Sequence, residues 1–250
     1  MANVAVGNRY NIKTFQKAYP TAGTDSFKLV SSNAQIFLHS FLAYNANSLS
    51  TDLGLAIAMA PTAWKLYTAN VNTGPGTDST AAIQAGTATS IFTTVSNQGF
   101  LVESPKQFGY LTFTLSQAET GAPVYSYQYW NGSAWTTLNV SQTPVYTSTG
   151  VVHVTFNPPV DWATGDGGLG ANTGYSVRVR ATTAPTQAVK ATSLRVGYWL
   201  CYRKGMAAGS QVAVSFDMHP LLLESGEALA PYFSTAYNYN AIEAAYQQAP

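Results

Sequence analysis

Charged side chains are scarce in this sequence. Only 9% of its 250 residues are Asp, Glu, Lys or Arg, whereas an average soluble domain contains about 25%. The 12 basic and 11 acidic residues nearly cancel, which leaves a formal net charge of +1. Such a balance offers no basic surface for a phosphate backbone, so nucleic acid is excluded as a partner. It also leaves little repulsion between molecules, which favours association.

Cysteine, histidine and long apolar runs are also nearly absent. The single Cys201 has no partner for an intramolecular disulfide, and three scattered histidines do not complete a structural zinc site. No apolar run reaches the roughly 18 residues that a membrane-spanning helix requires. The N-terminal residues lack the basic and apolar regions of a secretory signal. We therefore expect no metal, no cofactor and no membrane contact, and synthesis in a cytoplasm.

Signatures of catalysis are missing too. There is no G-x-S-x-G elbow, and no motif places two carboxylates as a glycosidase requires. Residues 165–170 match G-x-G-x-x-G, but a dinucleotide site needs a strand before this motif and a helix after it. Here a Pro-Pro segment precedes the motif and a strand-like run follows it. Asp161 and Asp166 match no EF-hand spacing, so turn roles are favoured over Ca²⁺ binding. We expect a surface loop and no enzyme.

The residues that replace charge are hydroxylated and aromatic. The chain contains 29 Thr, 21 Ser, 16 Tyr, 11 Phe and 5 Trp, side chains that suit the pleated, half-buried surface of a β-sheet. Apolar and polar residues alternate over 110–115, 152–156 and 175–180, as expected where one sheet face is buried and the other exposed. The sequence therefore predicts an all-β protein, an antiparallel β-sandwich of jelly-roll-like type.

The alternation also assigns side chains to the two faces of the strands. The residues expected in the interior are Leu111, Phe113, Leu115, Val154, Phe156, Val177 and Val179. The residues expected to point outward are Thr112, Thr114, Arg178 and Arg180. A slip of one residue in register would exchange the two sets, so the assignment is a sharp test of the pattern.

Helical patterns are rare in the sequence. Asp78-Ser79 can cap a short helical turn over Thr80–Ala85, and Gly86 would end it. The C-terminal segment Ala241–Gln248 also has the composition of a short terminal helix. We expect helix to be a minor component beside the sheets.

Two turn-forming stretches divide the chain. Thr73-Gly74-Pro75-Gly76 and Lys204-Gly205 bracket a central block that contains four of the five Trp residues. The flanks hold too few strand-like runs to close a sheet separately. We therefore expect two sandwiches, one inserted in the other: a discontinuous outer domain of 1–75 and 205–250 with terminal arms, and an inserted domain of 76–204. One continuous sandwich with long loops is the alternative.

The strongest local signal is a hairpin around Asn131-Gly132. This pair separates alternating aromatic runs, and it favours the type I′ turn, which requires positive φ at both central positions. With a two-residue loop, Tyr129 and Thr136 share one face of the hairpin, and Trp130 and Trp135 share the other. A four-residue loop would shift this pairing, and the sequence leaves both registers open.

The hairpin is part of a longer pattern. The segment YQYWNGSAWTTL at 127–138 is followed by VVHVTFNPPVDW at 151–162 and by TGYSVRVRAT at 173–182. In this order the three segments resemble a β-sandwich module of tailed-bacteriophage virion proteins, over residues 108–182. The resemblance implies a component of the virion surface, on the head, tail or fibres. It implies no catalytic residue.

Composition and resemblance together suggest a non-enzymatic structural component of a bacteriophage particle, located in the virion and assembled in the host cytoplasm. We expect a capsid decoration, or cement, protein that binds the head surface and stabilises it. Its partners would be the major capsid protein or other virion proteins, and further copies of itself in a homotrimer. The alternatives are a tail, baseplate or fibre component, for which a heptad stalk is lacking, and a glycan-binding host-adhesion module that uses exposed Tyr and Trp.

The two ends of the chain differ in charge. Residues 1–28 contain four basic side chains and one acidic, whereas 217–250 contain four acidic side chains and no Lys or Arg. Both ends contain aromatic residues, which a solvated tail seldom needs. We expect ordered arms that contact neighbouring subunits, where complementary charge sets the register; two solvated tails are the alternative. The candidate inter-subunit residues are Arg9, Tyr10, Lys13, Phe15, Lys17, Glu224, Glu227, Tyr237, Tyr239 and Glu243.

Overall fold

The computed structural model describes residues 13–18, 23–24, 36–45, 51–141, 143–215, 221–224, 226–233 and 241–248. In these ranges the chain is mainly β-strand, with one short α-helix, α1 (Thr80–Gln84), and one 3-10 turn, η1 (Pro61–Ala63). The expected all-β, antiparallel sandwich is confirmed. No helix in the described part of the chain is long and apolar enough to cross a membrane.

The chain folds into two compact units. Met1–Ile57 and Leu200–Pro250 form one, here called the flanking unit, and Ala58–Trp199 form the other, the central unit. The boundaries expected from the turn residues lie later in the chain, at 75/76 and 204/205. Residues 58–75 lie with the central unit because β5 (Lys65–Ala69) pairs with β8 (Gly99–Ser104). The boundary between the two units is therefore set by strand pairing, and the positions of turn residues do not reveal that pairing.

One layer of the central unit is a six-stranded antiparallel sheet. The order of its strands is β11 (Trp135–Thr137), β10 (Val124–Trp130), β13 (Tyr175–Thr183), β8, β5 and β6 (Thr77–Asp78). Chain neighbours β10 and β11 form the aromatic hairpin at one edge, and the central strands β13 and β8 come from distant parts of the chain. The middle of this sheet therefore depends on long-range pairing.

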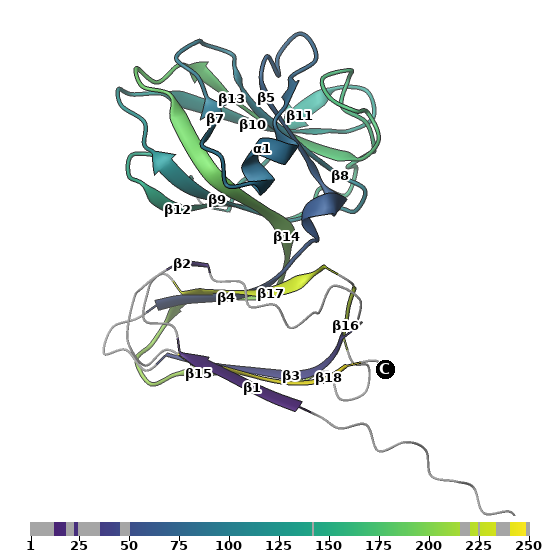
Figure 1. The fold of residues 1–250 in the computed structure, drawn as a ribbon, viewed down its shortest axis with the longest axis vertical. Helices are drawn as coiled ribbons and strands as arrows, with labels where there is room; N and C mark the ends of the chain where they lie inside the picture. Colours follow the sequence, from purple (N-terminus) through teal and green to yellow (C-terminus); the bar gives the residue numbers. More distant parts are fainter. Residues whose placement is uncertain are drawn as a thin grey trace, which may run out of the picture. The chain divides into compact units, whose positions relative to one another are not determined.

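The second layer of the central unit is built around β9. β9 (Tyr110–Gln117) lies between β12 (Gly150–Thr155) and β14 (Val189–Met206), and β7 (Thr89–Phe92) also pairs with β14. Figure 1 labels these strands. The unit boundary at 199/200 falls within β14.

The core of the central unit lies between these two layers. Phe100 of β8 meets Phe113 of β9 with ring centroids 4.9 Å apart, and Phe92 meets Tyr146 at 5.2 Å. All seven side chains expected in the interior are at most 3% exposed: Leu111, Phe113, Leu115, Val154, Phe156, Val177 and Val179. This part of the prediction is confirmed, because strict alternation identifies the apolar face of each strand.

Two of the four side chains that were expected to point outward are buried, so the prediction is wrong for them. Thr112 is 4% exposed and Arg178 is 5% exposed, while Thr114 and Arg180 are partly exposed. The Thr112 hydroxyl lies 2.8 Å from Nδ1 of His153 on the neighbouring strand. Alternation separates the two faces of a strand, but it does not reveal whether the polar face is covered as well.

The two helix predictions have opposite outcomes. Helix α1 is confirmed at Thr80–Gln84, where Oδ1 of Asp78 accepts the backbone N–H of Thr80 at 3.0 Å. The terminal helix is wrong: Ala241–Gln248 is the strand β18, paired with both β1 and β3. Eight residues are too few for a stable isolated helix, whereas two partner strands supply hydrogen bonds on both sides.

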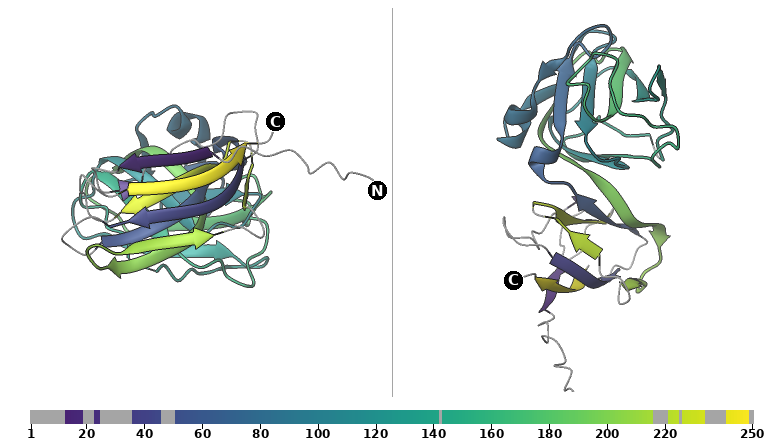
Figure 2. Two further views of the ribbon diagram at one scale, coloured as in Figure 1. Left: turned by 90° about the horizontal axis from the view of Figure 1, so that it is seen from below. Right: turned by 90° about the vertical axis from the view of Figure 1, so that its right-hand side faces the viewer.

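The flanking unit contains both ends of the described chain. One of its layers has the strand order β1 (Lys13–Ala18), β18 (Ala241–Gln248), β3 (Ile36–Tyr44) and β15 (Gln211–Ser215), and β16 (Leu221–Leu223) also pairs with β3. The left view of Figure 2 shows this layer from below. The other layer contains β4 (Thr51–Ala58), β17 (Ala228–Phe233) and β2 (Gly23–Thr24). Leu38, Leu55, Leu223 and Leu229 are fully buried.

Candidate functional site

The aromatic hairpin is closed by a four-residue loop. Trp130 pairs with Trp135, so the loop is Asn131–Ala134. Oδ1 of Asn131 accepts the backbone N–H groups of Ser133 at 3.0 Å and Ala134 at 2.8 Å, which stabilises this longer turn. The two registers that the sequence left open differ by an even number of residues, so the two Trp side chains lie on one face in either case.

These Trp side chains support a glycine-rich loop, defined here as residues 163–174. The rings of Trp130 and Trp135 meet edge to face, with centroids 5.6 Å apart. A Cβ added at Gly165 would lie 3.0 Å from Nε1 of Trp130, and the φ of Gly165 is +113°, a conformation that side chains rarely adopt. The loop thus rests on the half-buried Trp130, which is not a free platform for a ligand.

The outer face of the six-stranded sheet has a small core of its own. Tyr67, Val71, Leu101 and Leu169 form a buried cluster, and Trp135 packs against it. The guanidinium Cζ of Arg178 lies 4.4 Å from the centroid of the Trp135 ring. Leu169 comes from the glycine-rich loop, so the loop covers this face of the sheet. That cover explains why Arg178 is buried.

Asp166 organises the glycine-rich loop from within. Its side chain is 0% exposed. Oδ1 accepts the N–H of Gly168 at 2.7 Å, and Oδ2 accepts the N–H of Gly170 at 2.5 Å and of Asn172 at 3.0 Å. The side-chain Oδ1 of Asn172 in turn accepts the N–H of Asp166 at 3.0 Å. One carboxylate therefore holds three backbone donors of the same loop.

Glu103 holds the same loop from the sheet. It lies in β8 and is 3% exposed. Oε2 accepts the N–H of Ala171 at 3.0 Å, and Oε1 accepts the N–H of Asn172 at 3.1 Å and lies 3.4 Å from the hydroxyl of Ser176. The glycine-rich loop is thus tied both to itself and to a central strand. We call Glu103 and Asp166 together the carboxyl clamp.

The carboxyl clamp favours a proton on Glu103. Glu103 and Asp166 each place an oxygen about 3 Å from the N–H of Asn172, so two buried carboxyl groups converge on one donor. Two adjacent buried carboxylates cannot both stay ionised at low cost. Burial, followed by the hydrogen bond and the charge of Asp166, raises the pKa of Glu103 to about 7. At neutral pH the proton on Glu103 is therefore only partly retained.

Close approach fixes glycine at position 170. A Cβ there would lie 2.8 Å from Cε2 of Tyr67 and 2.9 Å from Oδ2 of Asp166, closer than side-chain atoms approach in real structures. The burial of Tyr67, together with the charges of Glu103, Asp78 and Asp166, raises its pKa to about 12. The glycine pattern that resembled a phosphate-binding motif thus serves to pack a loop against a tyrosine ring and a carboxylate.

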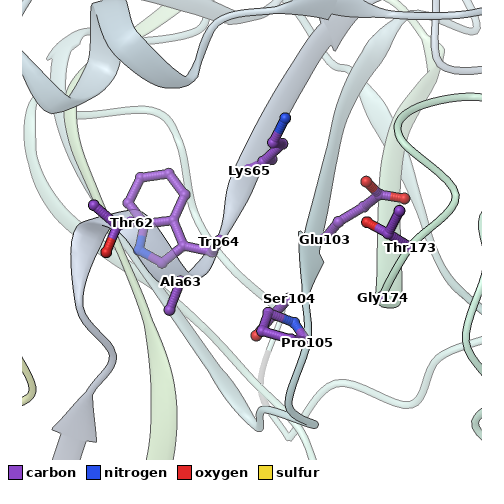
Figure 3. A pocket seen from close by; sticks show the side chains of 9 residues that line it. All are labelled: Thr62, Ala63, Trp64, Lys65, Glu103, Ser104, Pro105, Thr173 and Gly174. Atoms are coloured by element: carbon purple, nitrogen blue, oxygen red, sulfur yellow. The ribbon is translucent and has the colours of Figure 1, made fainter. Parts of the chain in front are cut away.

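A pocket of about 270 Å³ opens beside the carboxyl clamp. Figure 3 shows Trp64 on one side of it, Glu103 and Thr173 on the other, and Lys65 between them. Lys65 and Glu103 are direct partners in the register of β5 and β8. The pocket is small, and the Glu103 oxygens are already engaged by backbone donors. The arrangement supports positioning of the loop by Glu103.

The expected inter-subunit residues fall into three groups. Lys13, Phe15 and Lys17 lie in β1, and Glu243 lies in β18; these two strands pair within one chain, with Gln16 opposite Glu243. Glu227 is 6% exposed, and its Oε2 accepts the N–H of Glu224 at 3.0 Å. The residues outside the described ranges are Arg9, Tyr10, Tyr237 and Tyr239. Contacts of this set with neighbouring subunits stay a prediction.

The carboxyl clamp is not predicted by the sequence patterns. Asp166 was assigned to turn chemistry, which its three backbone acceptor contacts agree with, but its burial and its pairing with Glu103 were not foreseen. A usable signal was present: Glu103 is a charged residue that directly follows the apolar run GFLV in the same strand. A buried charge of this kind requires specific partners.

Comparisons with known proteins assign no function to this site. In the part of the chain that the structure describes, no group of three or more His, Cys, Asp or Glu side chains could hold a metal ion. No protein-family model matches the sequence, and no curated protein matches it either.

Proposed function

We propose that this chain is a non-enzymatic structural component of a bacteriophage particle, a decoration protein that binds the head surface and stabilises it. The observation that carries the proposal is the insertion of one β-sandwich into another, with the first and last described strands, β1 and β18, paired in the flanking unit. In this proposal the flanking unit holds the shell and the central unit is displayed. The partners are the major capsid protein and further copies of the chain in a trimer.

The connection between the units supports the display role. The N–H of Met59 donates to the carbonyl oxygen of Val196 at 2.7 Å, so the two chain segments that lead into and out of the central unit lie side by side. A domain inserted at adjacent points leaves the host sheet intact, which is why such insertions are tolerated. The central unit can therefore be carried without disturbing the strands that the flanking unit needs for binding.

The surface composition supports protein partners. With only 9% charged residues, contact faces can be desolvated at lower cost than charged ones. The acidic groups with the strongest burial in the central unit, Glu103 and Asp166, are engaged by backbone N–H groups. They support a structural role and offer no free pair for hydrolysis.

The location of the chain in an intact particle tests the proposal. Particles would be assembled with and without the chain, labelled with an antibody against the central unit, and imaged. We expect labels distributed over the head and absent from particles that lack the chain. Particles assembled without the chain should also release their genome at a lower temperature than complete particles. Labels confined to the tail would support the tail or fibre alternative, and unlabelled particles would overturn the virion proposal.

A further inference from the structure

A groove of about 580 Å³ lies on the central unit, away from the carboxyl clamp. Its walls are the segments 137–141 and 157–161, and Tyr129 of β10 completes its lining. A volume in the range of 300–1,000 Å³ is typical of sites for small ligands. No feature of the decoration role requires this groove.

Two asparagine side chains lie side by side in the groove. Val140 forms a β-bridge with Phe156, and the N–H of Ser141 donates to the carbonyl oxygen of Thr155 at 2.7 Å. This register places Asn139 directly opposite Asn157. Because Phe156 points into the core, the alternation of the strand directs the two asparagines to the opposite face. Cross-strand neighbours have Cβ atoms roughly 4.5–5.5 Å apart, so the two asparagines are neighbours on this face, and we call them the amide pair.

The amide pair is available for a ligand. Asn139 and Asn157 are both exposed, and neither side-chain amide has a hydrogen-bond partner among the described residues. Each amide offers an oxygen acceptor and two N–H donors. Together they match a ligand whose neighbouring groups both donate and accept, as hydroxyl groups do.

A carboxylate held in place lies at the other end of the groove. Oδ1 of Asp161 accepts the hydroxyl of Tyr129 at 2.7 Å. Tyr129 is 6% exposed, so a buried side chain fixes the orientation of an exposed one. Oδ2 of Asp161 makes no hydrogen bond within the described part of the chain and remains an acceptor for a further hydroxyl group.

The remaining wall is apolar and firmly supported. Val160 is fully exposed at the tip of the Pro158-Pro159-Val160 segment. Trp162, two residues later, is 4% exposed, and its Nε1–H donates to the carbonyl oxygen of Ser176 at 3.2 Å. The two prolines restrict the backbone of the segment further. A rigid apolar edge beside polar groups suits the C–H face of a sugar ring.

We propose that this groove binds a neutral oligosaccharide, with Asn139, Asn157 and Asp161 engaging its hydroxyl groups and Val160 packing against a ring face. Neutral ligands are favoured because Asp161 is the only charged residue of the lining, and it would repel an anionic sugar. The proposal goes beyond the decoration role and does not depend on it. It gives the central unit a recognition function of its own.

Binding of defined sugars to the purified full-length chain tests this proposal. A panel of neutral tri- to hexasaccharides (glucans, galactans and N-acetylglucosamine oligomers) and a matched sialylated panel would be titrated by calorimetry. We expect at least one neutral oligosaccharide to bind, and its sialylated counterpart to bind more weakly. The double variant Asn139→Ala/Asn157→Ala should weaken binding about tenfold to thirtyfold, since it removes the two amides.

Gln107→Ala is the matched control, because Gln107 is an exposed amide outside the groove. It should bind like the wild type. Both variants should keep the wild-type melting temperature, since neither changes a buried side chain, so a loss of binding cannot be attributed to unfolding. The absence of binding across the neutral panel would overturn the proposal, as would an unchanged affinity of the double variant or a preference for the sialylated panel.

Discussion

The two faces of the six-stranded sheet in the central unit are both buried, but by different means. On the inner face, aromatic and aliphatic side chains from two sheets interlock, as Phe100 and Phe113 do. On the outer face, a loop without regular secondary structure is held by the carboxyl clamp and by Arg178 on Trp135. The inner face follows from the pattern of the sequence, whereas the outer face depends on particular polar contacts.

The difference has consequences for stability. Apolar burial contributes roughly in proportion to area and does not change with pH. A buried polar group stabilises only while its partners are in place, and leaving it unpaired is costly. The outer face is therefore expected to be the part of the central unit that responds to pH, while the inner face sets the overall free energy of unfolding.

The largest expected effect is on the inner face. Phe113→Ala removes a ring that is 0% exposed and in contact with Phe100. It should lower the free energy of unfolding by about 3–5 kcal/mol, because the cavity collapses only in part. Chemical denaturation of the wild type and the variant measures this difference. A change below about 1 kcal/mol would show that this face is not the main core of the unit.

The carboxyl clamp gives the next largest effect, and it depends on pH. The pKa of Glu103 is raised from 4.5 to about 7 by burial and by Asp166, so the folded state binds this proton more tightly than the unfolded state does. The stability that it contributes is fully present below pH 4.5 and is lost as the pH rises to about 7. At about 1.4 kcal/mol per pH unit, the upper limit of this contribution is about 3–4 kcal/mol.

Glu103→Gln isolates that contribution, because the amide resembles the protonated acid and does not titrate. The difference in unfolding free energy between wild type and variant should change in the variant's favour between pH 4.5 and 7. Denaturation series at several pH values measure it. A difference that stays constant over this range would mean that the two carboxyl groups do not share a proton.

The contrast between the two faces also explains which features of the fold the sequence predicted correctly and which it did not. Leu111, Phe113 and Val179 were placed correctly, because one apolar face needs only a period of two. Arg178 was misplaced, because the cover over it comes from a loop whose path no local pattern encodes. The helix expected over Ala241–Gln248 is wrong, because its Ala, Glu and Gln residues favour a helix locally while its partner strands β1 and β3 lie far away in the sequence.

The candidate site was harder to predict than the fold. The glycine spacing of residues 165–170 drew attention to the correct loop, but the reason for the glycines is contact with Tyr67, Asp166 and Trp130. The sequence did not predict the groove: the glycan-binding alternative relied on exposed Tyr and Trp, whereas the lining of the groove is mainly Asn, Pro and Val. Its amide pair depends on the bridge between Val140 and Phe156, two residues whose pairing no turn signal predicts.

The smallest expected effect separates geometry from charge on the outer face. Arg178 donates from Nε and from one terminal nitrogen to Oε1 of Gln128 at 3.1 and 2.7 Å, and from the other to the carbonyl oxygen of Val71 at 3.2 Å. Lysine keeps the charge but cannot reproduce this fork or its stacking on Trp135. Arg178→Lys should therefore cost about 1–2 kcal/mol of unfolding free energy. Arg180→Lys is the matched control: Arg180 is only partly buried and donates from Nη1 to Oδ1 of Asn72 at 2.5 Å, a contact that an ammonium can also make, so this substitution should cost less than Arg178→Lys. Equal losses in the two variants would mean that the face requires no more than a positive charge on this strand.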